Sequence, residues 1–76
     1  MSVIIISFDE KIHSSFICRN TDIFNKIENL LYERYPQYKE SENYFHVKGR
    51  KINKYKTFEE NEIKNDDVIF LYRSDK

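Results

Sequence analysis

Glycine, proline and cysteine each occur once in the 76 residues, and alanine and tryptophan do not occur at all. With a single thiol, Cys18, the chain cannot form an internal disulfide, and no second cysteine or histidine lies nearby at a spacing typical of metal sites. We therefore expect no metal and no other cofactor. Because unpaired thiols are the rule in reducing compartments, we expect an intracellular, cytoplasmic protein.

The chain also lacks an excess of charge and a long apolar run. Its 13 basic and 13 acidic residues cancel, so no overall field attracts nucleic acid or a membrane surface. The longest apolar run, Val3–Ile6, is far shorter than the ~20 residues that span a bilayer. We expect one small domain, residues 1–76, that does not insert into membranes.

Two strands are predicted in the N-terminal part. Val3–Ile6 consists of β-branched residues, and Ile12–Cys18 alternates between a side that includes Phe16 and a more polar side. The polar stretch 7–11 between them predicts a hairpin. Which residues of Val3–Ile6 face the core is left open by the sequence.

A helix is predicted next, ending at Pro36. Its predicted N-terminal caps are Asn20, Thr21 and Asp22. Apolar residues then recur at spacings of three and four, which predicts a wide buried stripe. These residues are Ile23, Phe24, Ile27, Leu30, Leu31 and Tyr35. The outer side of the helix is expected to carry Lys26, Glu28, Asn29 and Glu33.

The C-terminal half predicts two more strands. After a polar, irregular stretch at 37–43, Tyr44–Val47 reads as a strand that ends at Lys48 and Gly49. Val68–Tyr72 is the most apolar strand, so we place it in the middle of the sheet. This order predicts an α+β fold in which one main helix packs across one face of a mixed, four- to five-stranded sheet.

Three stretches of the second half carry a family resemblance. They are Gly49 to Ile52, Thr57 to Ile63 and Asp66 to Leu71. In these stretches the chain resembles the ubiquitin-like, or β-grasp, family. The spacings also have a physical reason, since Ile52, Phe58 and Ile63 can each place an apolar side chain in the core from a polar crossing. We expect Thr57 to cap the short turn that follows it, and Gly49 to supply a restricted turn.

The resemblance implies that Ile23, Ile27 and Leu30 face the sheet. The family members that become conjugated end in two glycines, whereas this chain ends with Leu71–Lys76 and has none there. We therefore expect a non-conjugated module that binds proteins, as a structural or scaffolding subunit of a larger assembly. Two alternatives stay open: an N-terminal domain that docks a longer protein to the ubiquitin or proteasome machinery, and a truncated modifier.

The resemblance also suggests where a partner protein binds. The positions of the family's exposed hydrophobic patch correspond to Phe8, His46 and Tyr72, and Phe70 lies on the same strand face as Tyr72. Phe8 or Phe70 could instead belong to the core, because a slip of one residue exchanges the faces of a strand. We favour the register that buries Ile69 and Leu71 and exposes Phe70 and Tyr72.

A second candidate surface is basic. It comprises Lys48, Arg50, Lys51, Lys54 and Lys56. Such a run could bind RNA or an acidic protein surface, but most runs of this size are solvated loops, and nucleic acid is the lesser expectation. Cys18 and His13 are expected on opposite strand faces, so we expect a buried, inert thiol and no enzymatic activity.

Overall fold

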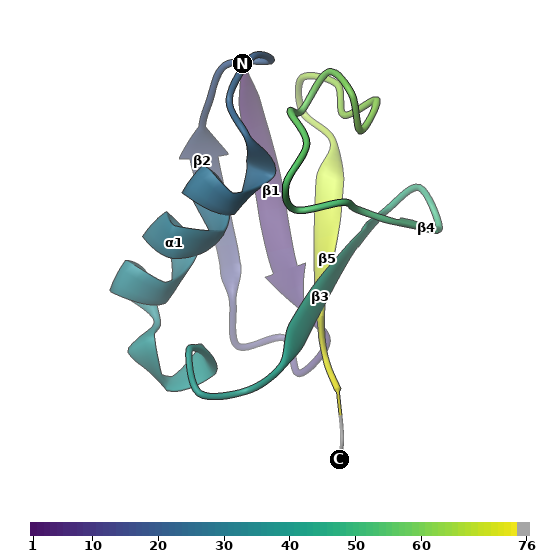
Figure 1. The fold of residues 1–76 in the computed structure, drawn as a ribbon. Coiled ribbons are helices and arrows are strands. Elements are labelled where there is room, and N and C mark those ends of the chain that lie inside the picture. The colour runs from purple at the N-terminus through teal and green to yellow at the C-terminus, as the bar shows by residue number, and fades with distance from the viewer. Residues whose placement is uncertain (75–76) are drawn as a thin grey trace.

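The computed structural model describes residues 1–74 of the chain (Figure 1). The prediction of a non-conjugated end includes Asp75 and Lys76, which lie outside the described residues. The elements are β1 Ser2–Ser7, β2 His13–Ile17, α1 Phe24–Arg34, the 3₁₀ helix η1 Pro36–Tyr38, β3 Asn43–Val47, β4 Arg50–Lys51 and β5 Val68–Arg73.

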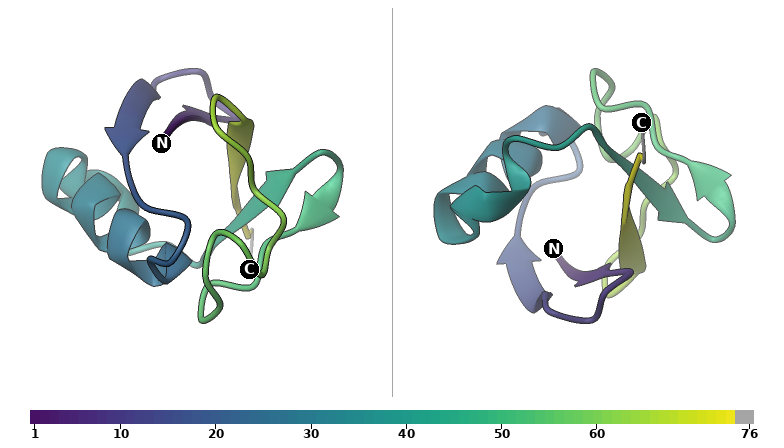
Figure 2. Two further views of the ribbon diagram at one scale, coloured as in Figure 1. Left: turned by 90° about the horizontal axis from the view of Figure 1, so that it is seen from above. Right: turned by 90° about the horizontal axis from the view of Figure 1, so that it is seen from below.

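The five strands form one mixed sheet in the order β2-β1-β5-β3-β4. β1 and β5 are parallel, and the other neighbouring pairs are antiparallel. In Figure 2 the sheet curves around one side of the molecule, and α1 lies across its inner face. The predicted α+β class is confirmed, and the arrangement is β-grasp-like. The central position predicted for the last strand is confirmed as well.

Alternation along β1 and β5 decides which residues enter the core. Ile69 and Leu71 are buried while Phe70 is 41% exposed, so the predicted register of the last strand is confirmed. On β1 it is Val3 and Ile5 that are fully buried, which resolves the facing that the sequence left open. Side chains at even positions of β1 and β5 therefore point away from α1.

Two residues of the predicted apolar stripe of α1 do not face the sheet. Phe24, Ile27 and Leu31 are buried against it, whereas Ile23 is 48% and Leu30 38% exposed. The prediction for Ile23 and Leu30 was therefore wrong. Spacings of three and four define an apolar stripe that is wider than the surface of α1 in contact with the sheet. Phe24 lies in the core, where its ring contacts those of Phe45 and Phe58.

The helix begins at Phe24, and its N-cap residue is Ile23, which makes no side-chain capping bond. The predicted caps at Asn20, Thr21 and Asp22 were wrong. The carboxylate of Asp22 instead accepts a hydrogen bond from the backbone N–H of Arg19. The N–H groups of Phe24 and Asn25 donate to the carbonyls of Lys56 and Lys54, so a segment distant in sequence satisfies the first turn.

The polar stretch between α1 and β3 contributes to the core, contrary to its irregular appearance in the sequence. Tyr38 in η1 is buried, and its hydroxyl donates to the carboxylate of Asp9 at 2.7 Å. Asn43 is also buried, and its side-chain amide donates to the carbonyl of Tyr38. The tyrosine hydroxyl and the amide each have a partner, so burying them is not costly.

The segment 52–67 between β4 and β5, which we call the β4–β5 crossing, agrees with the prediction. Ile52, Phe58 and Ile63 are all buried. Thr57 caps the short turn: its hydroxyl accepts from the N–H of Glu60, and the Glu60 carboxylate accepts from the N–H of Thr57. Gly49 has φ +79°, which confirms the left-handed turn expected after β3.

Candidate functional site

The face of the sheet opposite α1, which we call the outer face, is not covered by any other element within residues 1–74. Its outward-pointing positions on the five strands follow from the alternation and the strand register. They are Ser2, Ile4 and Ile6 on β1, His13, Ser15 and Ile17 on β2, Tyr44 and His46 on β3, Lys51 on β4, and Val68, Phe70 and Tyr72 on β5. All are exposed or partly exposed, and most are apolar or aromatic.

Three rings form a cluster on this face. The rings of Tyr44 and Tyr72 stack with centroids 5.5 Å apart, and His46 meets Tyr72 edge-on at 5.1 Å. Tyr44 and Tyr72 are cross-strand partners, so the β3–β5 register itself sets this contact. The sequence prediction identified His46 and Tyr72 but missed Tyr44. Its position two residues before His46, on the same strand face, was the available signal.

Phe8 and Phe70 lie beside this cluster. Phe70 is opposite His46 on one side and Ile6 on the other. The N–H of Phe8 donates to the carbonyl of Leu71, which continues the β1–β5 pairing, and the Phe8 side chain is 50% exposed. The structure therefore brings His46, Phe70 and Tyr72 together on the outer face, and Phe8 directly follows β1 beside β5.

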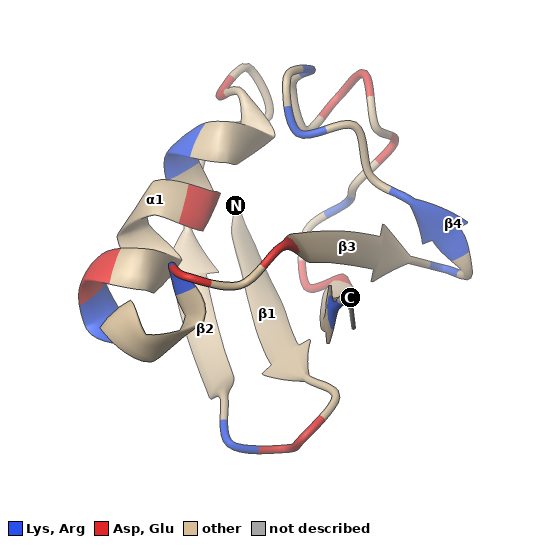
Figure 3. Cartoon of the chain, turned by 60° about the horizontal axis from the view of Figure 1, so that its bottom comes forward, with Lys and Arg blue, Asp and Glu red and all other residues tan. Residues whose placement is uncertain are grey.

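The outer face carries no carboxylate at any outward strand position within the described part of the chain. Lys51 is the lysine at these positions, and His13 and His46 are the histidines. In Figure 3 the acidic residues gather on the loops and the helix, while β1, β2 and β3 carry neither blue nor red. The Nζ of Lys51 lies 5.7 Å from the centroid of the Tyr44 ring, within reach of a cation–π interaction.

Several residues of the predicted basic patch contact acceptors within the protein. Lys48 pairs with Asp67 at 3.5 Å. The guanidinium of Arg50 donates to the carbonyls of Asn61 and Glu62. Only part of the run therefore offers cations that are not already held by the protein's own acceptors.

Lys54 is committed to a buried polar network. Its Nζ lies 2.9 Å from Oε2 of Glu28, which is 4% exposed, and 3.3 Å from the carbonyl oxygen of Asn43. The predicted outward position of Glu28 was wrong, because two donors stabilise its carboxylate inside. The second donor is the hydroxyl of Tyr32, at 2.6 Å. Burial, together with this hydrogen bond, raises the pKa of Tyr32 above its ordinary value.

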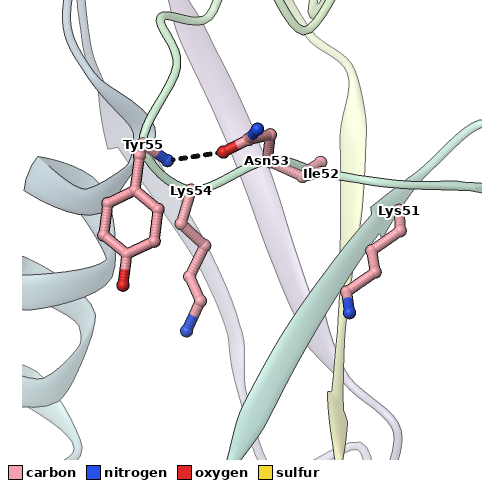
Figure 4. Close-up of a pocket in the computed structure, with 5 residues that line it drawn as sticks. All are labelled: Lys51, Ile52, Asn53, Lys54 and Tyr55. Carbon is pink, nitrogen blue, oxygen red and sulfur yellow. Dashed lines mark hydrogen bonds between the residues drawn. The ribbon is translucent and has the colours of Figure 1, made fainter.

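Two hollows lie at the β4 end of the molecule. One, of about 360 Å³, is lined by the segment 51–55 (Figure 4). The other, of about 340 Å³, is lined by Glu42, Asn43, Tyr44, Lys51, Lys54 and Ser74. Both hollows include Lys51 and Lys54, and Tyr44 connects the second one to the ring cluster.

Asp9 and Cys18 have shifted pKa values with structural causes. Hydrogen bonds from Ser7 and Tyr38 lower the pKa of Asp9 to about 2, and burial raises the pKa of the Cys18 thiol. Cys18 is buried, as predicted, and His13 is exposed on β2. Within residues 1–74, no three His, Cys, Asp or Glu side chains come together in a way that could hold a metal ion.

The fold and this face define a β-grasp-like protein with an open, aromatic sheet surface. No protein-family model and no curated protein matches the sequence. The ubiquitin-like assignment therefore stays a prediction. No helix among residues 1–74 is long and apolar enough to cross a membrane.

Proposed function

We propose that this chain is a ubiquitin-like protein-docking module, not conjugated to other proteins, that serves as a structural or scaffolding subunit of an assembly. The partner binds to the outer face of the sheet through Phe8, His46, Phe70 and Tyr72. The observation that carries this proposal is the continuity of the exposed face, where these four side chains adjoin Tyr44 and Ile6. Contiguous exposed apolar surface of this kind is typical of protein interfaces.

The chemistry of the face favours a protein partner. Tyrosine and phenylalanine are enriched in protein interfaces, and tyrosine is also enriched among the residues that dominate binding energy. The aliphatic residues Ile4, Ile6 and Val68 extend the apolar surface across β1 and β5. A nucleic acid would need more cations than the face provides, since Lys48, Arg50 and Lys54 contact the protein's own acceptors.

Replacing Phe8 and Tyr72 together by alanine tests the proposal. The endogenous protein and the double variant are affinity-purified, and bound proteins are identified by mass spectrometry. We expect the partners of the wild type to be lost, because both side chains are partly exposed and their removal takes away contact area. Circular dichroism should show an unchanged fold.

The matched control is Leu30→Ala, which shortens an exposed apolar side chain on α1, on the other side of the sheet. This variant should retain all partners. Unchanged partners after Phe8→Ala with Tyr72→Ala would remove the outer face from consideration. The same mass spectra detect isopeptide links to lysine, and finding the chain so attached would contradict the non-conjugated part of the proposal.

A further inference from the structure

We infer that the protein segment docked on the outer face carries an aspartate or glutamate whose carboxylate enters between Lys51 and Lys54. The inference rests on the proposed docking function and adds the chemistry of the partner. The inference is argued from three observations: the hollow beside β3 that Lys51 and Lys54 line, the fixed position of the Lys54 ammonium group, and the charge of the surrounding surface.

The hollow exists because β4 is short. β4 pairs with His46 and Val47, and the N–H of Ile52 donates to the carbonyl of Phe45, so no strand continues along Asn43 and Tyr44. The hollow of about 340 Å³ occupies this place, and Lys51 and Lys54 stand in its lining together with Tyr44. Figure 4 shows both lysine side chains extending to the same side of the segment 51–55.

Lys54 is held in place as a donor. Two of its three N–H bonds are directed to Glu28 and to the carbonyl of Asn43. An ammonium group has three donors, so Lys54 has one beyond these two contacts. Lys51 approaches the ring of Tyr44 and has no ion pair within the described residues, so its charge can be neutralised by a partner.

The surrounding charges favour a single carboxylate over a polyanion. The ammonium group of Lys54 is paired with the buried carboxylate of Glu28, so these two groups and Lys51 together carry one net positive charge. Glu42 also stands in the lining of the hollow and has an interaction partner of its own, and one net positive charge cannot balance a chain of successive phosphates. The outer face has no carboxylate at its outward strand positions in residues 1–74, so no group at those positions repels an acidic partner.

The register fixes how far the carboxylate lies from an apolar anchor. His46 is opposite Phe70 on β5 and opposite Lys51 on β4, so Phe70 and Lys51 are two strand spacings apart. Two spacings are about 10 Å. A partner spans this distance with about seven residues of helix or about three residues of extended chain.

The test uses the full chain and a display library of short random peptides. Peptides selected for binding are resynthesised with an amidated C-terminus, so that only side chains supply carboxylates. We expect the selected peptides to contain an apolar residue and an Asp or Glu, separated by about seven residues in a helix or about three in an extended chain. Amide chemical shifts should change at Tyr44, His46, Lys51 and Phe70 on binding.

Variants separate the inference from the docking function. Lys51→Gln should weaken the selected peptides about threefold, as expected for a partly exposed ion pair, and replacing the peptide's acid by its amide should have a similar effect. Lys64→Gln, the same change at an exposed lysine of the β4–β5 crossing, should leave binding unchanged.

Peptides that bind the outer face without an acid, or that ignore Lys51→Gln, would overturn the inference while leaving the docking function in place. Shift changes away from the outer face would overturn both. Oligouridine that displaces the peptides and binds more tightly would assign this surface to single-stranded nucleic acid, contrary to the inference.

Discussion

At the scale of single residues, a chain with one glycine must place other residues in the left-handed backbone conformation at its turns. Glu10, Lys48, Glu62 and Asp66 have positive φ angles between 51° and 68°, in addition to Gly49. Residues with a Cβ atom are disfavoured in this region by about 1–2 kcal/mol each. The N–H groups of Glu10, Glu62 and Asp66 donate to the carbonyls of Ser7, Glu59 and Ser2, and these hydrogen bonds stabilise the turns.

Glu10→Gly should stabilise the protein. Glu10 is exposed with φ 61°, and its backbone N–H donates to the carbonyl of Ser7, a bond that glycine keeps. Relief of the strained backbone exceeds the entropic cost of glycine, so we expect the free energy of unfolding to rise by about 0.5 kcal/mol. Urea denaturation measures the change.

The opposite substitution is the control. A Cβ added to Gly49 would meet no atom within 4 Å, so Gly49→Ala tests the backbone conformation alone. It should lower the free energy of unfolding by about 1 kcal/mol. Equal stability of the Gly49→Ala variant and the wild type would show that these turns carry no strain.

Asp9 links stability to pH. Its pKa is lowered from 3.8 to about 2, mainly by the hydrogen bond from Ser7 and then by that from Tyr38. Because the folded pKa lies below the unfolded one, the stabilisation is present above pH 3.8 and is lost as the pH falls through about 2. Between these values the wild type should lose more stability than Asp9→Asn does. Urea titrations at pH 5 and at pH 2.5 compare the two proteins, and parallel losses would contradict this role.

At the scale of elements, the Glu28–Lys54 pair fastens the β4–β5 crossing to α1 and to β3. Lys54 contacts Glu28 of the helix and the carbonyl of Asn43 at the start of β3. Tyr32 also links α1 to β3, since its hydroxyl donates to Glu28 and accepts from the Asn43 amide. Three elements therefore meet at one buried carboxylate.

Lys54→Met should destabilise the protein by about 2 kcal/mol, because it leaves the Glu28 charge buried without its cation. We place this below the usual cost of a fully buried pair, since the Lys54 side chain is 29% exposed. The double variant Glu28→Gln with Lys54→Met should recover part of the loss. A double-mutant cycle from urea denaturation gives the coupling, and additive effects would mean that the pair contributes little.

At the scale of the whole molecule, the sheet was largely predictable and the contacts around the helix were not. The spacing from Ile63 favoured the register that buries Ile69 and Leu71, and both residues are buried in the structure. The helix start was missed because its caps are carbonyls of Lys54 and Lys56, which no local pattern reveals. Burial of Glu28 was missed for the same reason, since its partner lies 26 residues away.

The candidate site was predictable to the extent that it follows strand alternation. The family resemblance suggested Phe8, His46 and Tyr72, and strand alternation added Phe70 on the same face as Tyr72. The position of Tyr44 beside Tyr72 and the role of Lys54 depend on the register between strands. Register is set by the packing of the complete sheet and is not visible in one strand.

The capping of α1 by the carbonyls of Lys54 and Lys56 also bears on how the chain folds. A helix of 11 residues is marginal alone in water, and here its first turn has no cap of its own. It becomes stable only when a segment more than 25 residues downstream arrives. Contacts so distant in sequence slow folding, so α1 should consolidate late, together with the crossing, and the two halves of the chain should fold as one cooperative unit.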